Sequence, residues 1–324
     1  MSGLHGWKLW ALVMVAVIAA TCAPLLAQNN YQVQIMFQIA LFAGLGLAWN
    51  LVGGYAGQLS LGHVAFFGVG SYGFALLTRL SVPNWVAVFL AAIAATTLAV
   101  IIGVIVFRLR GPYFTLATIA VAEVLRLTAR NLDFTGGATG LDTPALFHGR
   151  TFWKMFYFAV MGLAVVAFLV NLWVARSRFG YRLMAIREDE DTASAVGIDP
   201  ARKKLQALLI SAFLTGVGGA LYASAFQYIV PDDVLHIDRS VQMAIIAMLG
   251  GAGTLVGPIL GAVLLISASE LFKNQFHEAQ LLIYGILIVA VVLFLPEGIV
   301  GGIKQLWNWL RKKKKPMALE AASG

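Results

Sequence analysis

Charge and cysteine are both scarce in this sequence. Only 12% of its 324 residues are charged, where about a quarter is usual for a soluble domain, and 60% are hydrophobic. Cys22 is the only cysteine, which excludes a disulfide within the chain and any cysteine-based metal site. With a mean hydropathy of +0.83, the composition is typical of a polytopic helical membrane protein and not of a soluble enzyme.

Motifs for catalysis are missing as well. The sequence contains no Gly-x-x-x-x-Gly-Lys-Ser/Thr phosphate loop, no metal-ligand spacing and no matched nucleophile and base. We therefore predict no enzymatic activity, no cofactor and no metal. The net charge of +8 comes mostly from basic clusters that flank apolar runs. We interpret these clusters as signals of membrane orientation and not as a nucleic-acid site.

The apolar residues form ten segments that could enter a membrane. Their predicted bounds are 8–27, 34–52, 62–79, 84–107, 113–130, 153–175, 205–229, 240–252, 256–272 and 280–297. The first could be mistaken for a cleaved signal peptide, but its long apolar run favours a retained helix. The eighth is shorter than the roughly 20 residues that a crossing needs. We expect one all-α polytopic membrane domain over residues 1–324, with about ten segments that include broken or half-spanning helices.

Basic residues predict how these segments are oriented. Seven Arg and Lys residues lie in the loop at 176–204, and the tail at 304–324 contains the run RKKKK, so both are expected in the cytoplasm. An even number of crossings must separate them, which is why the stretch 240–272 is divided into two segments. Six crossings precede the loop, which places the N-terminus in the cytoplasm and the loop at 131–152 outside. Segments two to five and seven to ten then begin on opposite sides, as an inverted repeat would require.

Glycines gather at two places within the apolar sequence. One is the stretch WNLVGGYAGQLSLGHVAFFGVGSYGFALL at 49–77, and the other is GGAGTLVGP at 250–258. Irregular backbone at membrane depth is tolerated only where protein or water surrounds it, and broken helices are typical of translocation paths. We therefore predict a helix break at each place. The glycines assigned to the breaks are Gly53, Gly54, Gly57, Gly250, Gly251 and Gly253, whereas Gly62, Gly68 and Gly70 are expected to serve close helix packing.

Polar side chains accompany the first break. Tyr55, Gln58 and Ser60 are candidates for lining the translocation path or its gate, with a purely structural role as the alternative. His63 fits a hydrogen-bonded structural histidine better than a proton carrier. These side chains could also satisfy backbone groups that the break sets free.

The fifth segment contains ionisable residues, which are costly within a membrane span and normally face the protein interior. Glu123 and Arg126 are three positions apart, so they share a helix face and can form an ion pair. This pair is either structural or lines the path. Arg130 lies at the outer edge, where its long side chain can reach the membrane surface.

The cytoplasmic loop contains a predicted short helix, REDEDTASAVG at 187–197. Asp189 or Asp191 could cap its start, and Gly197 suits its C-terminal end. Four apolar residues distinguish this helix from a solvated loop and would offer a small hydrophobic surface to another protein. They are Ala193, Ala195, Val196 and Ile198.

Five motifs occur here in the order of one transporter family. They are LVGGYAGQLSLGHVAFFGVGSY, GPYFTLATIAVAEVLR, FTGGATGL, FGYRLMAIREDEDTASAVGID and GGAGTLVGPILGA, within about residues 34–297. They resemble the membrane subunits of bacterial branched-chain amino acid ABC importers, and the M-type permease more than the H-type. The resemblance implies that an ATPase docks on the loop before the seventh segment, at Arg187, Glu188, Asp189, Glu190, Ala193 and Gly197. It also marks an outer-loop motif, which consists here of Thr135, Gly136, Gly137 and Thr139.

The function that this resemblance implies is a permease subunit that moves branched-chain or other hydrophobic amino acids across the bacterial inner membrane. Its partners would be a second permease subunit of the H-type, two cytoplasmic ATPase subunits and a periplasmic solute-binding protein. Thr139 stands where the family usually has Asn or Asp, so an importer for urea or another small organic solute is an alternative. An ion-coupled secondary transporter that uses Glu123 and His63 is a weaker alternative, as is an intramembrane enzyme. The sequence shows no acidic relay and no catalytic pair for either.

Overall fold

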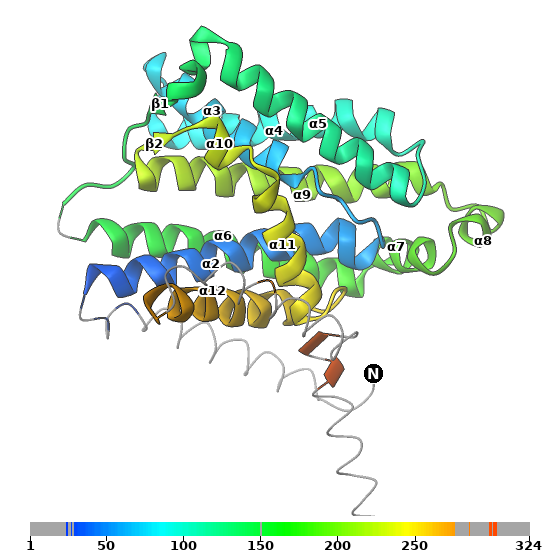
Figure 1. Cartoon of the computed structure of the whole chain (residues 1–324). Coiled ribbons are helices and arrows are strands. Elements are labelled where there is room, and N and C mark those ends of the chain that lie inside the picture. The colour runs from blue at the N-terminus through cyan, green and yellow to red at the C-terminus, as the bar shows by residue number, and fades with distance from the viewer. Residues whose placement is uncertain are drawn as a thin grey trace, which may run out of the picture.

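The computed structural model describes residues 29–149 and 151–275, with side chains to residue 271, and a few isolated positions outside these ranges. The described chain is a bundle of helices with one short two-stranded ribbon (Figure 1). Its elements are α2 (Asn30–Asn50), the π-helical turn η1 (Leu51–Tyr55), α3 (His63–Arg79), α4 (Asn84–Val106), α5 (Pro112–Asn131), the 3₁₀ turns η2 (Asp133–Thr135) and η3 (Gly137–Thr139), β1 (Leu141–Asp142), α6 (Phe152–Arg176), α7 (Arg178–Glu188), α8 (Glu190–Ala195), α9 (Pro200–Phe226), β2 (Tyr228–Ile229), α10 (Pro231–Val234), α11 (Ile237–Gly250) and α12 (Gly257–Gln275).

The central helix of the bundle is α9, which packs against α3 and α4 as well as α2 and α6 (Figure 1). Small residues allow this close approach. A Cβ on Gly70 of α3 would lie 2.2 Å from the carbonyl oxygen of Gly216 of α9, and a Cβ on Gly219 would lie 2.0 Å from the carbonyl oxygen of Phe67. The predicted packing role of Gly70 is therefore confirmed.

The described helices agree with eight of the ten predicted segments, and the first and last segments lie outside the described residues. Four helices are long and apolar enough to cross a membrane: α2 together with η1, α4, α6 and α9. Helix α11 has 14 residues, or roughly 21 Å at 1.5 Å per residue, which is less than the roughly 30 Å of a bilayer core. It is too short to cross alone, as the sequence indicated, whereas a half-spanning position and the total of ten stay predictions.

The two ends of the bundle differ in their loops (Figure 1). One end, called the α8 end below, carries α7 and α8. The opposite end, called the ribbon end, carries the antiparallel pair of β1 and β2, in which Leu141 faces Ile229, and α10 lies further toward the middle of the bundle (Figure 1). Long helices such as α6 and α9 connect the two ends, so the loop at 176–204 and the loop at 131–152 lie on opposite sides, as predicted.

Helix α4 shows how the bundle meets lipid. Its exposed side chains are large and apolar and recur at helical spacing, as in Trp85, Phe89, Ile93, Val100 and Val104. Its buried side is lined by alanines that touch the neighbouring helices. A helix of this kind needs no polar partner and can face the hydrocarbon.

Candidate functional site

The first predicted helix break lies at the end of α2. The last turn widens into η1, and a coil at 56–62 then leads to α3. Gly57 ends the helical part with a φ of +68°, a conformation that favours glycine. Gly53 instead allows the ring of Trp49 to pack against the backbone, since a Cβ at position 53 would lie 2.1 Å from that ring. That ring donates a hydrogen bond of 2.8 Å to the carbonyl of Ser60 and so holds the coil in place.

The second predicted break separates α11 from α12. Gly251 and Gly253 have φ angles of +122° and +79°, which end the helix. A Cβ on Gly250 would lie only 1.7 Å from the carbonyl oxygen of Gly257, so the two helix ends touch through backbone. The structure thus confirms a break at 250–253.

Asn50, in the last turn of α2, joins the two breaks. Its Oδ1 accepts a hydrogen bond of 2.8 Å from the backbone N–H of Gly253. Its Nδ2 donates to the carbonyl of Thr254 at 3.0 Å and to Oδ1 of Asn171 of α6 at 3.1 Å. Asn171 in turn donates to the carbonyl of Leu47. The sequence analysis missed both asparagines, although a buried amide within an apolar segment is a usable signal.

Threonines of α5 satisfy the backbone of the coil at 56–62. Thr115 Oγ1 donates to the carbonyl of Leu59 at 2.8 Å, and the N–H of Leu61 donates to Thr118 Oγ1 at 3.2 Å. The coil is therefore held against α5 although it has no helical hydrogen bonds of its own. One edge stays open, because Gly57 and Leu59 are exposed, Leu59 at 44%.

Three of the predicted path residues are buried inside the bundle. Nδ1 of His63 lies 3.0 Å from Ser60 Oγ, and its Nε2 lies 2.8 Å from Ser211 Oγ. Ser211 already donates to the carbonyl of Ala48, so Nε2 is the donor and Nδ1 accepts from Ser60. This neutral, fully bonded imidazole fits the structural role expected for His63. Tyr55 is buried as well, with its hydroxyl 3.5 Å from the carbonyl of Asn171, so only Gln58 of this group reaches the surface.

Glu123 and Arg126 form the predicted ion pair, with Arg126 Nε donating to Glu123 Oε2 at 2.9 Å. Arg126 also pairs with Asp232 of α10, and Arg130 Nη1 lies 3.7 Å from the same carboxylate. The neighbouring Asp233 turns the other way and pairs with Arg239 of α11. The short helix α10 therefore holds α5 with one carboxylate and α11 with the next.

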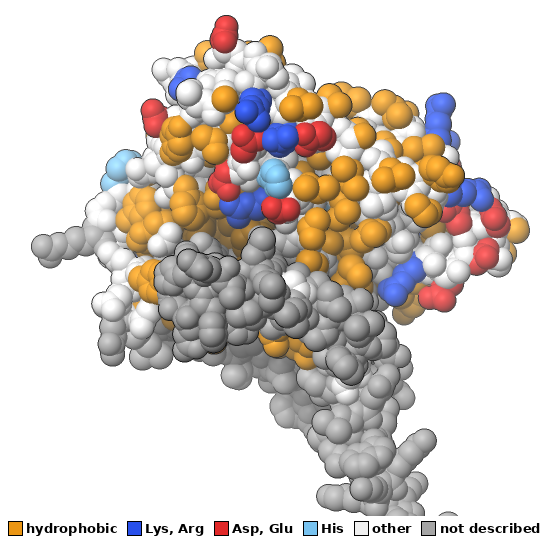
Figure 2. Space-filling model, in the orientation of Figure 1, with side chains coloured by type: hydrophobic (Ala, Val, Ile, Leu, Met, Phe, Trp, Pro, Cys, Tyr) orange, Lys and Arg blue, Asp and Glu red, His pale blue; other side chains and the backbone are white. Residues whose placement is uncertain are grey.

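These charges and the open edge of the coil share one surface, which Figure 2 shows as a charged group beside an apolar area. We call it the α5 face. Besides the charged residues, it contains the exposed side chains Leu59, Tyr113, Leu116, Val124 and Leu127. The last four recur at helical spacing along α5.

The depth of Glu123 decides what the α5 face can contact. It lies 11 residues after Pro112 and 8 before Asn131, or roughly 16 Å and 12 Å along the helix. Its side chain is nevertheless 45% exposed. A charged group at such a depth costs about 3 kcal/mol or more in lipid, and exposed coil backbone is not tolerated there at all. Helix α5 is not among the four helices that are apolar enough to cross a membrane, and its partly exposed charged face suits contact with protein or water better than contact with lipid.

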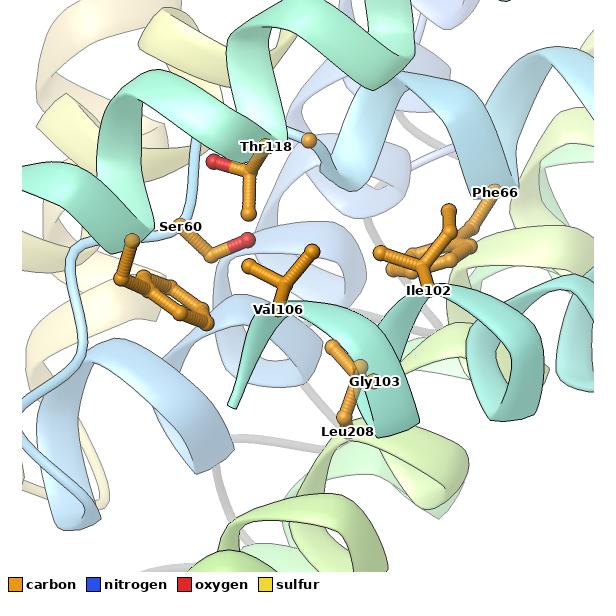
Figure 3. A pocket seen from close by; sticks show the side chains of 9 residues that line it. Ser60, Phe66, Ile102, Gly103, Val106, Thr118 and Leu208 are labelled. Atoms are coloured by element: carbon orange, nitrogen blue, oxygen red, sulfur yellow. The ribbon is translucent and has the colours of Figure 1, made fainter. Parts of the chain in front are cut away.

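A small cavity lies behind α5, between it and α3, α4 and α9. Figure 3 shows Thr118 of α5 and Ser60 on one side of the cavity, with Ile102 and Val106 of α4 opposite. Its volume is about 10 Å³, which is room for roughly one water molecule. An amino acid does not fit there, so a path for such a solute cannot run through this cavity.

The short helix predicted at 187–197 corresponds to the shorter α8, whereas Arg187 and Glu188 belong to the end of α7, a helix that the sequence analysis did not predict. Asp189 caps α8 by accepting a hydrogen bond from the backbone N–H of Thr192, which lowers the pKa of the Asp189 carboxyl. Gly197, with a φ of +84°, follows its C-terminal end. Both end signals were predicted from the sequence, and Asp189 rather than Asp191 is the cap.

The residues assigned to ATPase docking do not share one surface. Ala193 is only 3% exposed, because it packs inward against its own chain. Glu190 forms an ion pair of 2.6 Å with Lys204, whose side chain is buried and only 1% exposed. The exposed apolar residues of this segment are Ala195 and Val196, the latter at 72%. Arg187 points in a third direction and donates from Nη1 to the carbonyl of Gly54 at 2.7 Å.

Comparisons with known proteins identify the family. A family model described as branched-chain amino acid transport system / permease component matches residues 31–292. The chain belongs to this permease family. The high-affinity branched-chain amino acid permease protein LivM of Salmonella typhimurium is 30% identical over 319 residues, covering 89% of this chain and 74% of the relative. LivM of Escherichia coli is 30% identical over the same shares of both chains. A probable LivH of Methanocaldococcus jannaschii is 28% identical over 44% of this chain and 47% of its own.

Membership confirms the resemblance seen in the motifs. The match to LivM covers 89% of the permease and the match to LivH 44%, which agrees with the predicted M-type. The family is one of membrane transport components and not of catalytic enzymes. The intramembrane enzyme considered from the sequence is therefore disfavoured.

The outer-loop motif of the permease lies at the ribbon end. Gly136 and Gly137 have positive φ angles of 77° and 55°, and Thr135 Oγ1 donates to the carbonyl of Ala129 at 2.6 Å. The hydroxyl of Tyr228 donates to the carbonyl of Thr139. The motif is thus a folded cap over the end of α5, close to α10.

Proposed function

We propose that the permease is one membrane subunit of an ATP-driven importer of branched-chain or other hydrophobic amino acids in a bacterial inner membrane. A periplasmic binding protein would deliver the solute at the ribbon end. Two cytoplasmic ATPases would bind at the α8 end. This orientation, with both termini in the cytoplasm, is supported by the basic residues of the loop at 176–204.

The observation that carries the proposal is the α5 face. It combines charges at mid-span, open coil backbone and a stripe of apolar side chains on one side of the molecule, and it suits contact with protein or water better than contact with lipid. A second permease subunit of the H-type would cover the apolar stripe, and the solute would pass between the subunits. The charged group of Arg126, Arg130 and Asp232 would then line this path.

The ATPase contact would be made by the exposed side of α7 and α8. Val196 is the large apolar residue that this region exposes most, and Glu188 and Asp191 beside it are also exposed. Val196→Arg should weaken the association with the ATPases and reduce transport, because it places a charge where an apolar contact is proposed. Neither Val124→Arg nor Tyr181→Arg is a suitable control, since Val124 lies on the α5 face and Tyr181 on the exposed side of α7. If Val196→Arg purifies with the ATPases and transports normally, the docking site lies elsewhere.

Reconstitution tests the function directly. The permease, an H-type subunit, the two ATPases and the binding protein would be placed in liposomes, and uptake of radiolabelled leucine, isoleucine and urea would be compared. We expect uptake of leucine and isoleucine that requires ATP and the binding protein, and none by a complex whose ATPases cannot hydrolyse ATP. Uptake driven by a proton gradient without ATP would refute the proposal. Uptake of urea alone would keep the importer but replace the solute.

A further inference from the structure

Arg187 is the one residue of α7 that reaches the helix breaks. It lies in the last turn of α7, two positions before the Asp189 cap of α8. Its Nη1 donates to the carbonyl of Gly54, close to the C-terminal end of the long helix formed by α2 and η1. Helix carbonyls near a C-terminus lack partners and carry partial negative charge, so a guanidinium there is favourable.

The same side chain fills the corner between both breaks. A Cβ on Gly57 would lie 2.7 Å from Arg187 Cγ, and a Cβ on Gly253 would lie 2.8 Å from Arg187 Nη1. Glycine at these two positions therefore leaves the space that the arginine occupies. Among the described residues, no carboxylate pairs with Arg187, so its contacts in this region are with backbone.

The two breaks are also tied to each other at this point. Asn50 binds the N–H of Gly253 and the carbonyl of Thr254, as described above. Gly54 and Gly253 are in turn in contact, since a Cβ on Gly54 would lie 2.5 Å from the nitrogen of Gly253. Arg187 and Asn50 therefore hold the same backbone junction from two sides.

Helices α7 and α8 would move together with Arg187. Asp189 belongs to both, because its N–H donates to the carbonyl of Ala185 of α7 while its side chain caps α8. A shift of α8 must then displace the arginine relative to Gly54. The carbonyl of Gly54 and the guanidinium would then lose this hydrogen bond, so a displacement of α8 acts directly on the junction.

We infer that Arg187 is a positioning residue that transmits displacement of α7 and α8 to both helix breaks, and so couples the ATPases to the state of the path. The inference rests on the proposed function and deepens it. It separates Arg187 from the docking surface: the residue acts inside the permease, between the contact with the ATPases and the glycine junction.

The test uses the complete reconstituted importer and measures amino acid transported per ATP hydrolysed. We expect the ATPases to stay bound to Arg187→Gln and to hydrolyse ATP, while the amount of amino acid transported per ATP falls about tenfold. Loss of a hydrogen bond from a charged group at roughly 1.4 kcal/mol corresponds to this factor of ten. Arg187→Lys keeps the charge and one donor and should recover part of the ratio. Arg108→Gln, at an exposed position between α4 and α5 and outside the proposed docking surface, should behave as the wild type.

Each result decides between defined alternatives. A wild-type ratio in Arg187→Gln would overturn the inference, and so would loss of the ATPases from that variant, since Arg187 would then belong to the docking surface. If neither Arg187→Gln nor Arg187→Lys yields an assembled complex, Arg187 is needed for folding and the inference is wrong. Failure of the wild-type complex to transport amino acids with ATP would instead refute the proposed function.

Discussion

The hydrogen bonds of Asn50 allow a quantitative prediction. Asn50→Ala removes three hydrogen bonds, to the part-buried backbone groups of Gly253 and Thr254 and to the buried amide of Asn171. Interhelical hydrogen bonds in membrane proteins average about 0.6 kcal/mol each, because the unfolded chain finds other partners. The sum is about 2 kcal/mol, and the upper limit of about 1.7 kcal/mol per bond would give about 5.

This loss should appear as a lower midpoint of thermal unfolding in detergent. At roughly 2–4 °C per kcal/mol for a chain of this class, a loss of about 2 kcal/mol lowers the midpoint by about 4–8 °C. The matched control is Asn131→Ala, which deletes an exposed amide that binds only the carbonyl of Leu127 in its own helix. The control should unfold like the wild type.

A second substitution separates the two roles of the Asn50 side chain. Asn50→Asp keeps an oxygen for the N–H of Gly253 but removes both donated bonds and places a carboxylate in a buried site. It should destabilise the protein at least as much as Asn50→Ala. If Asn50→Ala unfolds at the wild-type midpoint, the amide does not hold the breaks together and the reasoning is refuted.

Further predictions concern the first break, the orientation and α8. Gly57→Ala and Gly54→Ala should both lower uptake at matched expression. Ala at position 57 would strain the left-handed backbone, and the Cβ of Ala at position 54 would lie 2.5 Å from the second break. Wild-type uptake by both variants would show that these glycines have no special role. With Cys22 replaced by Ser, an impermeant thiol reagent should label Asp233→Cys but not Asp189→Cys in intact cells, and the reverse pattern would overturn the orientation. Acidification should destabilise α8, because the pKa of the Asp189 carboxyl is lowered in the folded state. The stabilisation is present above the usual pKa of aspartate and is lost as the pH falls through the lowered value. Faster hydrogen exchange of the α8 amides at low pH would show this loss.

Features that depend on neighbours in sequence could be predicted. Apolar runs predicted eight of the described helices within a few residues, Gly57 and Gly253 marked the two breaks, and the spacing of Glu123 and Arg126 predicted their ion pair. Each of these follows from helix periodicity or from the conformational freedom of glycine.

Features that depend on distant parts of the chain could not be predicted. Arg187 and Gly54 are 133 positions apart, and nothing in the local pattern distinguishes this arginine from the others of the loop. Ala193 was assigned to a docking surface because it is apolar within a charged loop and because the family resemblance places ATPase docking there. Its burial follows from the pairing of Glu190 with Lys204, which brings α8 down onto α9.

The four residues of α10 impose a strict limit on insertions. Asp232 and Asp233 are adjacent, yet they bind arginines on different helices, Arg126 of α5 and Arg239 of α11. One extra residue between Pro231 and Val234 would turn whatever follows it by about 100° around the helix axis. Only one of the two ion pairs could then be kept, so an epitope tag or linker placed in this turn would release either α5 or α11 from its neighbour.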